Sequence, residues 1–278
     1  MSDPFKIDGP AMISFSGGRT SGYMLRRCLD AGIGPDVHVL FANTGKERPE
    51  TLDFVRDCGE RWGVRIHWLE YNGVNDAGRA TYAEVDHATA RRLGQPFEAL
   101  IELQGLPNPI ARFCTQALKI RPMSAWMHNV GGYEHWTNVV GIRADEPRRV
   151  ANLRQPSRER YERAMPLADA GVTELDVIAF WKAQPFDLRL RSYEGNCDLC
   201  FLKGKGKRIR IMAERPDLAA WWIAQESRPA QAGYAVSARF RADTAPYAKL
   251  AEFARRQMSL PVVTDRDGED LGDCACTD

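Results

Sequence analysis

The stretch ISFSGGRTSG at residues 13–22 places two glycines and several hydroxyl side chains in one turn. Gly17 and Gly18 can adopt positive φ and carry no Cβ, so backbone N–H groups can close around an anion. A helix that begins at this turn adds the positive end of its dipole. Hydroxyl donors flank the glycines at Ser16, Thr20 and Ser21. The sequence therefore predicts a phosphate or sulfate site, against the simpler alternative of a strand-to-helix turn rich in small residues.

Two common nucleotide-binding patterns do not occur in the sequence, namely G-x-x-x-x-G-K-[ST] and G-x-G-x-x-G. The first marks P-loop enzymes, and the second marks dinucleotide-binding folds. The glycine turn is therefore predicted to bind its anion as a loop of another class.

Seven cysteines are present, and in a reducing compartment they are better explained as ligands, nucleophiles or buried side chains than as disulfides. Cys28 and Cys58 fall on the apolar faces of two helical patterns, so we expect them in the core. Cys197 and Cys200 form a CxxC motif, and thiolates at this spacing can both face one metal centre.

The elements that would position these groups alternate between strand and helix. Strand patterns occur at 11–15, 37–43, 65–71 and 136–143, and a helical pattern begins at Pro49. This alternation predicts βαβ units, and hence an α/β fold with a doubly wound, mostly parallel sheet. Such sheets bind ligands at the carboxyl ends of their strands, where the glycine turn lies.

Residues 72–112 are less regular. HATARRLG at 87–94 is predicted to be helical, and QGLPNPIARF at 104–113 is predicted to be a loop. Pro122 is expected at the start of a helix. The apolar stripe of that helix is expected to pack in the core and consists of Met123, Trp126, Met127 and Val130.

Composition describes an ordinary globular chain. Its 278 residues are 44% hydrophobic and 27% charged, with a formal net charge of +1, which argues against a globally basic protein. No stretch approaches the roughly 18 consecutive apolar residues of a membrane span, and the N-terminus lacks an apolar signal core. We expect a cytoplasmic protein without a membrane partner.

The glycine turn SFSGGRTS resembles the pyrophosphate-binding loop of the PP-loop family, the adenine nucleotide alpha hydrolases. Further segments resemble one branch of that family, the phosphoadenosine phosphosulfate reductases. These segments, which extend the resemblance over residues 11–200, are VLFANTGKERPETLDFVRDCGERWGV (39–64), CTQALKIRPMSAWM (114–127), VVGIRADEPRR (139–149), and MPLADAGVTELDVIAFWKAQP followed by GNCDLC.

The resemblance implies an adenine nucleotide, ATP or phosphoadenosine phosphosulfate, with Mg²⁺ as a further candidate cofactor. Its implied contacts are Ser14, Ser16, Gly17, Gly18, Arg19, Thr20, Ser21, Asn43, Thr44, Gly45 and Gly141. Asn43 stands where the family usually has Asp. Lys119 and Arg143 would meet the sulfate or phosphate groups as catalytic cations, although a lone Lys or Arg is more commonly a solvated surface charge.

For the cysteines, the resemblance extends to adenylylsulfate reductases, in which matching positions hold a four-iron cluster. Cys114, Cys197 and Cys200 would be the ligands here. Those relatives have a Cys-Cys pair where this chain has Phe113 before Cys114, so one ligand of the 4Fe-4S cluster is missing. A tail cysteine could complete it, or the fourth iron could stay open. A four-thiolate zinc site and no metal at all are the alternatives.

The C-terminal DCACTD provides Cys274 and Cys276. In the related reductases, a cysteine near the C-terminus, within Glu-Cys-Gly-Leu-His, attacks the sulfate sulfur, and a thioredoxin-type thiol then releases sulfite. The tail of this chain has no histidine and a second thiol. Cys274 and Cys276 are therefore candidate catalytic nucleophiles, or an attacking and resolving pair.

Three functional classes follow. The first is a sulfonucleotide reductase, and the second is an ATP-dependent sulfur transferase that adenylates a nucleic acid or another acceptor and releases pyrophosphate. The third is a non-catalytic nucleotide sensor. Two basic stretches, KGKGKRIR (203–210) and the arginine-rich 148–163, make nucleic acid a possible partner.

The chain is divided near residue 165. Residues 1–165 are predicted to form the nucleotide-binding domain, and residues 166–278 a helical C-terminal segment that carries the CxxC motif and the Cys-Ala-Cys tail. Within the second part, Trp221 and Trp222 are expected in a helix, where they more often pack in the core than stack on bases.

Overall fold

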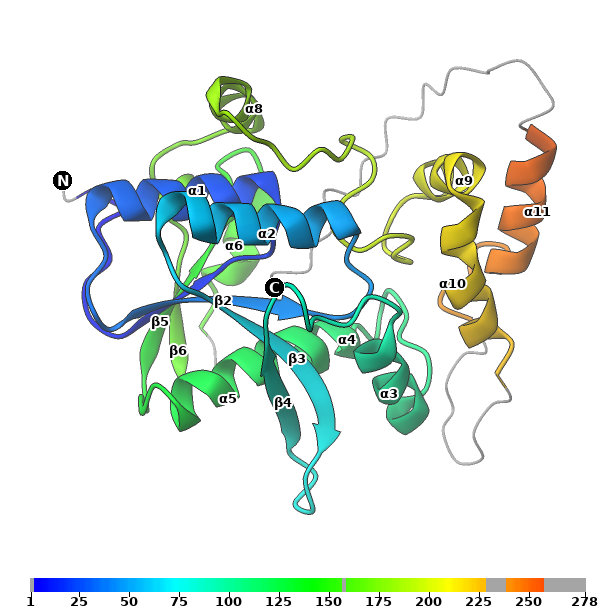
Figure 1. Ribbon diagram of the computed structural model, residues 1–278, viewed down its shortest axis with the longest axis horizontal. Helices are drawn as coiled ribbons and strands as arrows, with labels where there is room; N and C mark the ends of the chain where they lie inside the picture. The colour runs from blue at the N-terminus through cyan, green and yellow to red at the C-terminus, as the bar shows by residue number, and fades with distance from the viewer. Residues whose placement is uncertain (1–2, 157–158, 229–238, 258–278) are drawn as a thin grey trace.

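The computed structural model describes residues 3–156, 159–228 and 239–257. A six-stranded sheet with the order β4-β3-β2-β1-β5-β6 is its centre (Figure 1). Its strands are β1 (Ala11–Ser14), β2 (Val37–Asn43), β3 (Ile66–Val74), β4 (Ala80–Val85), β5 (Trp136–Val140) and β6 (Tyr161–Ala164). Every neighbouring pair is parallel except β3 and β4, so the predicted α/β fold with a mostly parallel sheet is confirmed.

Helices flank this sheet and continue beyond it. They are α1 (Arg19–Ala31), α2 (Pro49–Trp62), α3 (Gln95–Gln104), α4 (Phe113–Thr115), the π-helix η1 (Gln116–Ile120), α5 (Arg121–Asn129), α6 (Pro147–Leu153), α7 (Pro166–Asp169), α8 (Glu174–Ala183), α9 (Lys205–Glu214), the 3₁₀ turn η2 (Pro216–Leu218), α10 (Ala219–Glu226) and α11 (Tyr247–Gln257). Among the described residues, no helix is long and apolar enough to cross a membrane.

Alternation along the strands divides the core between the two faces of the sheet. Ala11 and Ile13 of β1 pack toward α1, α2 and α8, whereas Met12 packs toward α5 on the other face. Cys28 and Cys58 are fully buried within the first of these cores, as predicted. The helices thus cover both faces of the sheet.

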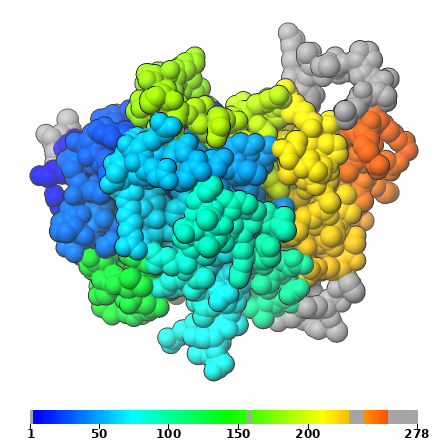
Figure 2. Space-filling view, in the orientation of Figure 1, coloured from blue at the N-terminus to red at the C-terminus, as the bar shows by residue number. Residues whose placement is uncertain are grey.

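The C-terminal helices α9, α10 and α11 form a separate apolar cluster at one side of the sheet (Figure 1). Their side chains pack together with those of α3 and η1, and the two parts form one continuous surface in Figure 2. Trp222 is fully buried at the centre of this cluster, and Trp221 is partly buried against it. Both lie on α10, so the predicted helix and its core packing are confirmed.

Two local predictions are wrong. Residues 87–94 do not form a helix: a turn at 87–89 is followed by irregular chain and a bend at 93–94. The Arg91 amide donates to Glu70 Oε1 of β3 (2.7 Å) instead of to a carbonyl of a helix. Val130 does not belong to the core stripe, since it follows the end of α5 and is 59% exposed. Met123, Trp126 and Met127 are buried as predicted.

Candidate nucleotide site

The glycine turn connects β1 to α1 at the carboxyl edge of the sheet. Gly17 has a φ of +77°, and a Cβ placed there would lie 2.7 Å from Thr51 Cγ2 and 3.0 Å from Val55 Cγ2 of α2. Both the backbone conformation and the close approach of α2 therefore require glycine. Gly141 after β5 is similarly confined, because a Cβ there would lie 3.1 Å from the Cα of Ser21.

Hydrogen bonds between hydroxyls and backbone shape the first turn of α1. Ser21 Oγ donates to the carbonyl of Gly18 (3.1 Å) and lies 2.9 Å from Ser16 Oγ. The N–H groups of a first helical turn have no partner within the helix, so they are available to an anion at the loop. The predicted donors Ser16, Thr20 and Ser21 all line one cavity beside this turn.

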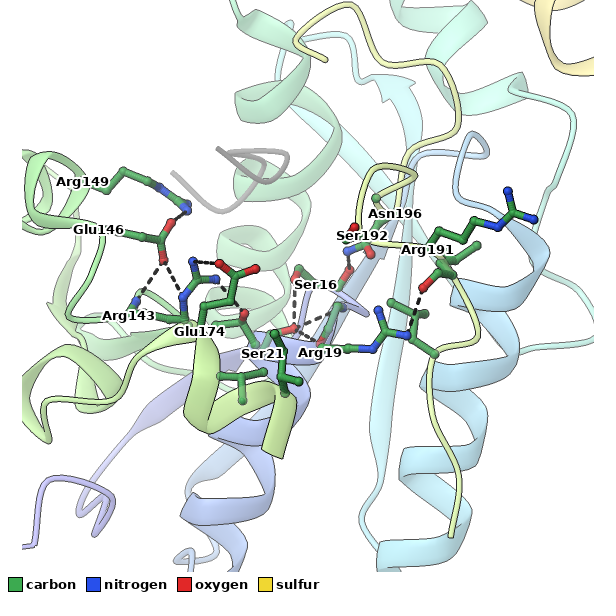
Figure 3. A pocket seen from close by; sticks show the side chains of 18 residues that line it. Ser16, Arg19, Ser21, Arg143, Glu146, Arg149, Glu174, Arg191, Ser192 and Asn196 are labelled. Atoms are coloured by element: carbon green, nitrogen blue, oxygen red, sulfur yellow. Dashed lines mark hydrogen bonds and ion pairs between the residues drawn. The ribbon is translucent and has the colours of Figure 1, made fainter. Parts of the chain in front are cut away.

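That cavity has a volume of about 170 Å³ and combines cations with an apolar wall. The apolar wall consists of Val177, Ile178, Leu188 and Leu190. The charged lining consists of Arg19, Arg143, Arg149 and Arg191, with Glu146 and Glu174 as the acidic members. In Figure 3, Arg143 and Arg149 lie on one side of Ser16 and Ser21, and Arg19 and Arg191 lie on the other. Cations with a neighbouring apolar surface suit an anionic ligand that carries a ring.

Arg143 is the cation in direct contact with the loop. Its Nη1 donates to Thr20 Oγ1 (3.2 Å), and its Nε donates to Asp145 Oδ1 (2.9 Å). Burial alone would raise the pKa of Asp145, but the Glu174 amide and the Arg143 guanidinium outweigh it and hold that pKa below its usual value. Arg143 is only 8% exposed. Its hydrogen bond to Asp145 fixes the guanidinium beside the loop.

Arg19 anchors the wall of the cavity. Its guanidinium binds both carboxylate oxygens of Asp187 (2.7 and 2.6 Å) and the carbonyl of Leu190 (3.0 Å). The indole Nε1 of Trp181 donates to the carbonyl of Arg19 (2.8 Å). The side chain thus connects the loop to residues 187–190, and its predicted contact with a nucleotide stays a prediction.

Lys119 lies on the other side of Ser16, in a smaller cavity of about 20 Å³. This cavity is also lined by Ser14, whose hydroxyl donates to Asn138 Oδ1 (2.7 Å). Lys119 Nζ is 3.7 Å from Glu47 Oε1, and its side chain is 12% exposed. Lys119 and Arg143 therefore line different cavities that share Ser16, rather than one common clamp.

The segment after β2 is buried and internally bonded. Asn43 donates through Nδ2 to Glu70 Oε1 (2.6 Å) and to the carbonyl of Arg91 (2.8 Å), and its Oδ1 accepts from the Gly45 amide (3.0 Å). The Thr44 amide donates to Glu47 Oε2 (2.7 Å). The structure thus explains why Asn stands at position 43: it must donate to the buried carboxylate of Glu70, which an Asp could not do.

The three described cysteines predicted to bind a metal, Cys114, Cys197 and Cys200, lie at one apolar cluster. Among the described residues there is no cluster of three or more His, Cys, Asp or Glu side chains placed to hold a metal ion. Cys197 and Cys200 are buried in the apolar cluster of the C-terminal helices. Cys114 packs against the same cluster, and burial raises the pKa of its thiol to about 11, with Lys119 opposing the shift. The iron–sulfur cluster stays a prediction, and Cys274 and Cys276 lie outside the described residues.

The basic stretches are divided between core and surface. Within residues 203–210, Arg208 is fully buried and Lys203 is 7% exposed, which leaves Lys205 and Arg210 as exposed charges. Within 148–163, Arg149 lines the cavity beside the glycine turn, whereas Arg148, Arg154 and Arg160 are exposed. The charge that 203–210 could offer a polyanion is therefore smaller than the sequence indicates.

Several lining residues were missed at the sequence level. Arg149 lies in the basic stretch already noted, but no local pattern marks Glu146, Glu174 or Asn196 as lining residues, or Asp187 as the partner of Arg19. These side chains approach the loop from segments that follow it by more than a hundred residues. Only the folded topology brings them there.

An open α/β sheet with a glycine loop and convergent arginines at its carboxyl edge defines a PP-loop type of nucleotide-binding protein. The phosphoadenosine phosphosulfate reductase domain matches residues 10–188, and the chain belongs to that family. Binding of an adenine nucleotide is expected of this family.

Two curated relatives are themselves uncharacterized. One is a nin region protein of Escherichia phage lambda, 34% identical over 207 residues that cover 70% of this chain and 67% of the relative. The other is a protein of Methanocaldococcus jannaschii, 26% identical over 227 residues that cover 78% of this chain and 41% of the relative. The chain thus spans about two fifths of the archaeal relative.

Proposed function

We propose that this protein is a sulfonucleotide enzyme that binds phosphoadenosine phosphosulfate or a close analogue, with the 5′ phosphosulfate at the glycine loop. The contact between Arg143 and Thr20 carries this proposal, because it fixes a buried cation against the first turn of α1. The loop amides and Arg143 would share the charge of one anionic group, while the apolar wall would receive the adenine.

Arginines on the two sides of the loop support a ligand with two separated anionic groups. Arg143 and Arg149 lie on one side, and Arg19 and Arg191 on the other (Figure 3). A nucleotide with a phosphate on its ribose and a sulfate at its 5′ end has this charge distribution. ATP gathers its charge in a single chain.

In the proposed reaction, a thiolate attacks the sulfate sulfur and the S–O bond to the nucleotide phosphate breaks. A dithiol reductant then supplies two electrons, becomes a disulfide and releases sulfite. The residues described here bind and orient the anion. The thiol that attacks, predicted to be Cys274 or Cys276, lies outside the described residues, and no step is assigned to a metal cluster.

An ATP-dependent sulfur transferase acting on nucleic acid is the second candidate. It is favoured by the exposed arginines near the wall of the cavity, Arg189, Arg191 and Arg210, whose side chains are 64%, 62% and 61% exposed. In that reaction the loop would hold the pyrophosphate that leaves when ATP adenylates an acceptor oxygen.

Turnover assays separate the candidates. We expect sulfite release from phosphoadenosine phosphosulfate in the presence of a dithiol such as reduced thioredoxin. Pyrophosphate release from ATP in the presence of RNA or DNA, without sulfite release, would instead establish the second candidate. Binding of either nucleotide without turnover would overturn both and leave a nucleotide sensor. The iron content of anaerobically purified protein tests the cluster separately.

A further inference from the structure

Asn196, the residue before the CxxC motif, lies directly over the glycine loop. Its Nδ2 donates a hydrogen bond to the carbonyl oxygen of Ser16 at 2.8 Å. A Cβ placed on Gly18 would lie 3.2 Å from the same Nδ2 and 3.5 Å from Oδ1. The side chain lines the nucleotide cavity and packs against the loop backbone (Figure 3).

The backbone on which this side chain is mounted is fixed by the segment after β2. The carbonyl of Asn196 accepts from the Arg48 amide (2.8 Å), and Cys197 forms an antiparallel bridge with Glu47. The Asp198 amide donates to the carbonyl of Lys46 (2.9 Å). Residues 196–198 thus run beside residues 46–48 through an isolated antiparallel bridge, which places the side-chain amide of Asn196 at a defined position.

Buried ion pairs reinforce this placement. Lys46 Nζ is 2.8 Å from Asp198 Oδ2, and both side chains are at most 7% exposed. Arg48 Nη2 is 3.2 Å from Glu194 Oε1, and the Arg48 side chain is 4% exposed. Pairs held this far from solvent restrict the segment more than surface pairs would. Asn196 therefore contacts the loop from a rigid support.

The donor character of Asn196 matters for an anion site. A carbonyl oxygen carries partial negative charge, and the Ser16 carbonyl stands at the entrance to the loop whose amides would hold the anion. A donor bonded to that carbonyl satisfies it and fixes its direction. An aspartate at this position could only accept, so it would face the carbonyl without a proton and add a negative charge beside the ligand.

We infer that Asn196 is a positioning residue for the nucleotide loop, through which the cysteine segment sets the orientation of the Ser16 peptide and hence the affinity for the anionic part of the nucleotide. This inference rests on the proposed nucleotide binding. It assigns no contact between Asn196 and the ligand itself.

The test compares Asn196→Asp with Asn75→Asp, a matched control. Asn75 lies in the β3–β4 turn and only accepts, from the amides of Ala77 (3.1 Å) and Arg79 (2.9 Å), so an aspartate can replace it with the same change of charge. Binding is measured for phosphoadenosine phosphosulfate, ATP and adenosine. Adenosine lacks the anionic chain and reports on the adenine wall alone.

We expect Asn196→Asp to lower the affinity for both anionic nucleotides about tenfold to hundredfold, with adenosine affinity unchanged. Asn196→Ala, which removes the donor without adding charge, should lose a smaller part of the same affinity. The control should bind like wild type.

Unchanged nucleotide affinity in both Asn196 variants would overturn the inference, as would an equal loss for adenosine and the anionic nucleotides or unfolding of both variants, because those results describe a structural residue. Wild-type protein that binds none of the nucleotides would instead overturn the proposed function, and the inference with it.

Discussion

At the scale of single residues, two requirements decide which residues can stand in and near the glycine loop: the room left for a side chain, and the need for a hydrogen-bond donor. Gly17 combines positive φ with a contact that leaves no room for a Cβ, and Asn43 must donate to a buried carboxylate. The sequence predicted that both positions belong to the nucleotide site, and that prediction stays open. The reason for Asn in place of Asp could not be predicted, because Glu70 reaches Asn43 only through the pairing of β2 with β3.

Gly17→Ala should destabilise the protein by about 3 kcal/mol or more, since strain at positive φ adds to a clash with α2. Gly63→Ala is the matched control: its φ is +62°, but nothing lies within 4 Å of an added Cβ, so a cost of about 1 kcal/mol is expected. Urea denaturation of both variants measures the difference. Equal costs would mean that α2 does not confine the loop.

Asn43→Asp should lower the free energy of unfolding by about 2–4 kcal/mol, because a second carboxylate would face Glu70, which is 1% exposed. Asn108→Asp provides the control, since Asn108 only accepts, from the amides of Ile110 and Ala111. Denaturant titrations at neutral pH compare the two. A wild-type stability for Asn43→Asp would show that Glu70 does not need this donor.

At the scale of elements, strands and helices with a strong periodic pattern of apolar residues could be predicted. Elements without such a pattern could not. The predicted strand over 37–43 matches β2, and the helix predicted from Pro49 is α2. The π-helix η1 just before Pro122 has no sequence pattern of its own. It places Lys119 in a cavity separate from that of Arg143, an arrangement that a simple helix start at Pro122 would not suggest.

His38 on β2 should make the stability of the protein depend on pH. Burial and the nearby His67 lower the pKa of His38 against the opposing effect of Asp36, so the unfolded chain binds this proton more readily. The contribution is present above the ordinary histidine pKa of about 6.5 and is lost as pH falls below it.

Between pH 7.5 and pH 5.5, the free energy of unfolding should therefore fall less in His38→Gln than in wild type. Equal losses in the two proteins would assign the acid sensitivity to other groups, such as His67 or Glu84, which bind each other at 2.7 Å.

At the scale of the whole molecule, the C-terminal helices and the sheet are connected next to the segment that follows β2. Asp198 accepts from the indole of Trp222 (2.8 Å) and pairs with Lys46 at the end of β2, so one buried carboxylate bonds to both parts. Cys114 belongs to the predicted nucleotide-binding part, and Cys197 and Cys200 belong to the C-terminal part, so shared ligation of a cluster would connect the two. The structure connects them through hydrogen bonds and ion pairs around the CxxC motif.

Asp198→Asn should cost about 3 kcal/mol by leaving Lys46 buried without its counter-charge. In the exposed pair Arg215–Asp217, the variant Asp217→Asn should cost less than about 0.5 kcal/mol. Chemical denaturation followed by tryptophan fluorescence measures both. If Asp198→Asn were as mild as the control, the pair would not hold the two parts together.

The most direct test of the nucleotide site is a crystal structure of the protein with phosphoadenosine phosphosulfate. We expect oxygens of the 5′ phosphosulfate about 3 Å from the amides of the first turn of α1, with Arg143 beside them and the adenine against the wall formed by α8 and residues 188–190. A nucleotide bound elsewhere, with the glycine loop making no contact to it, would contradict the account.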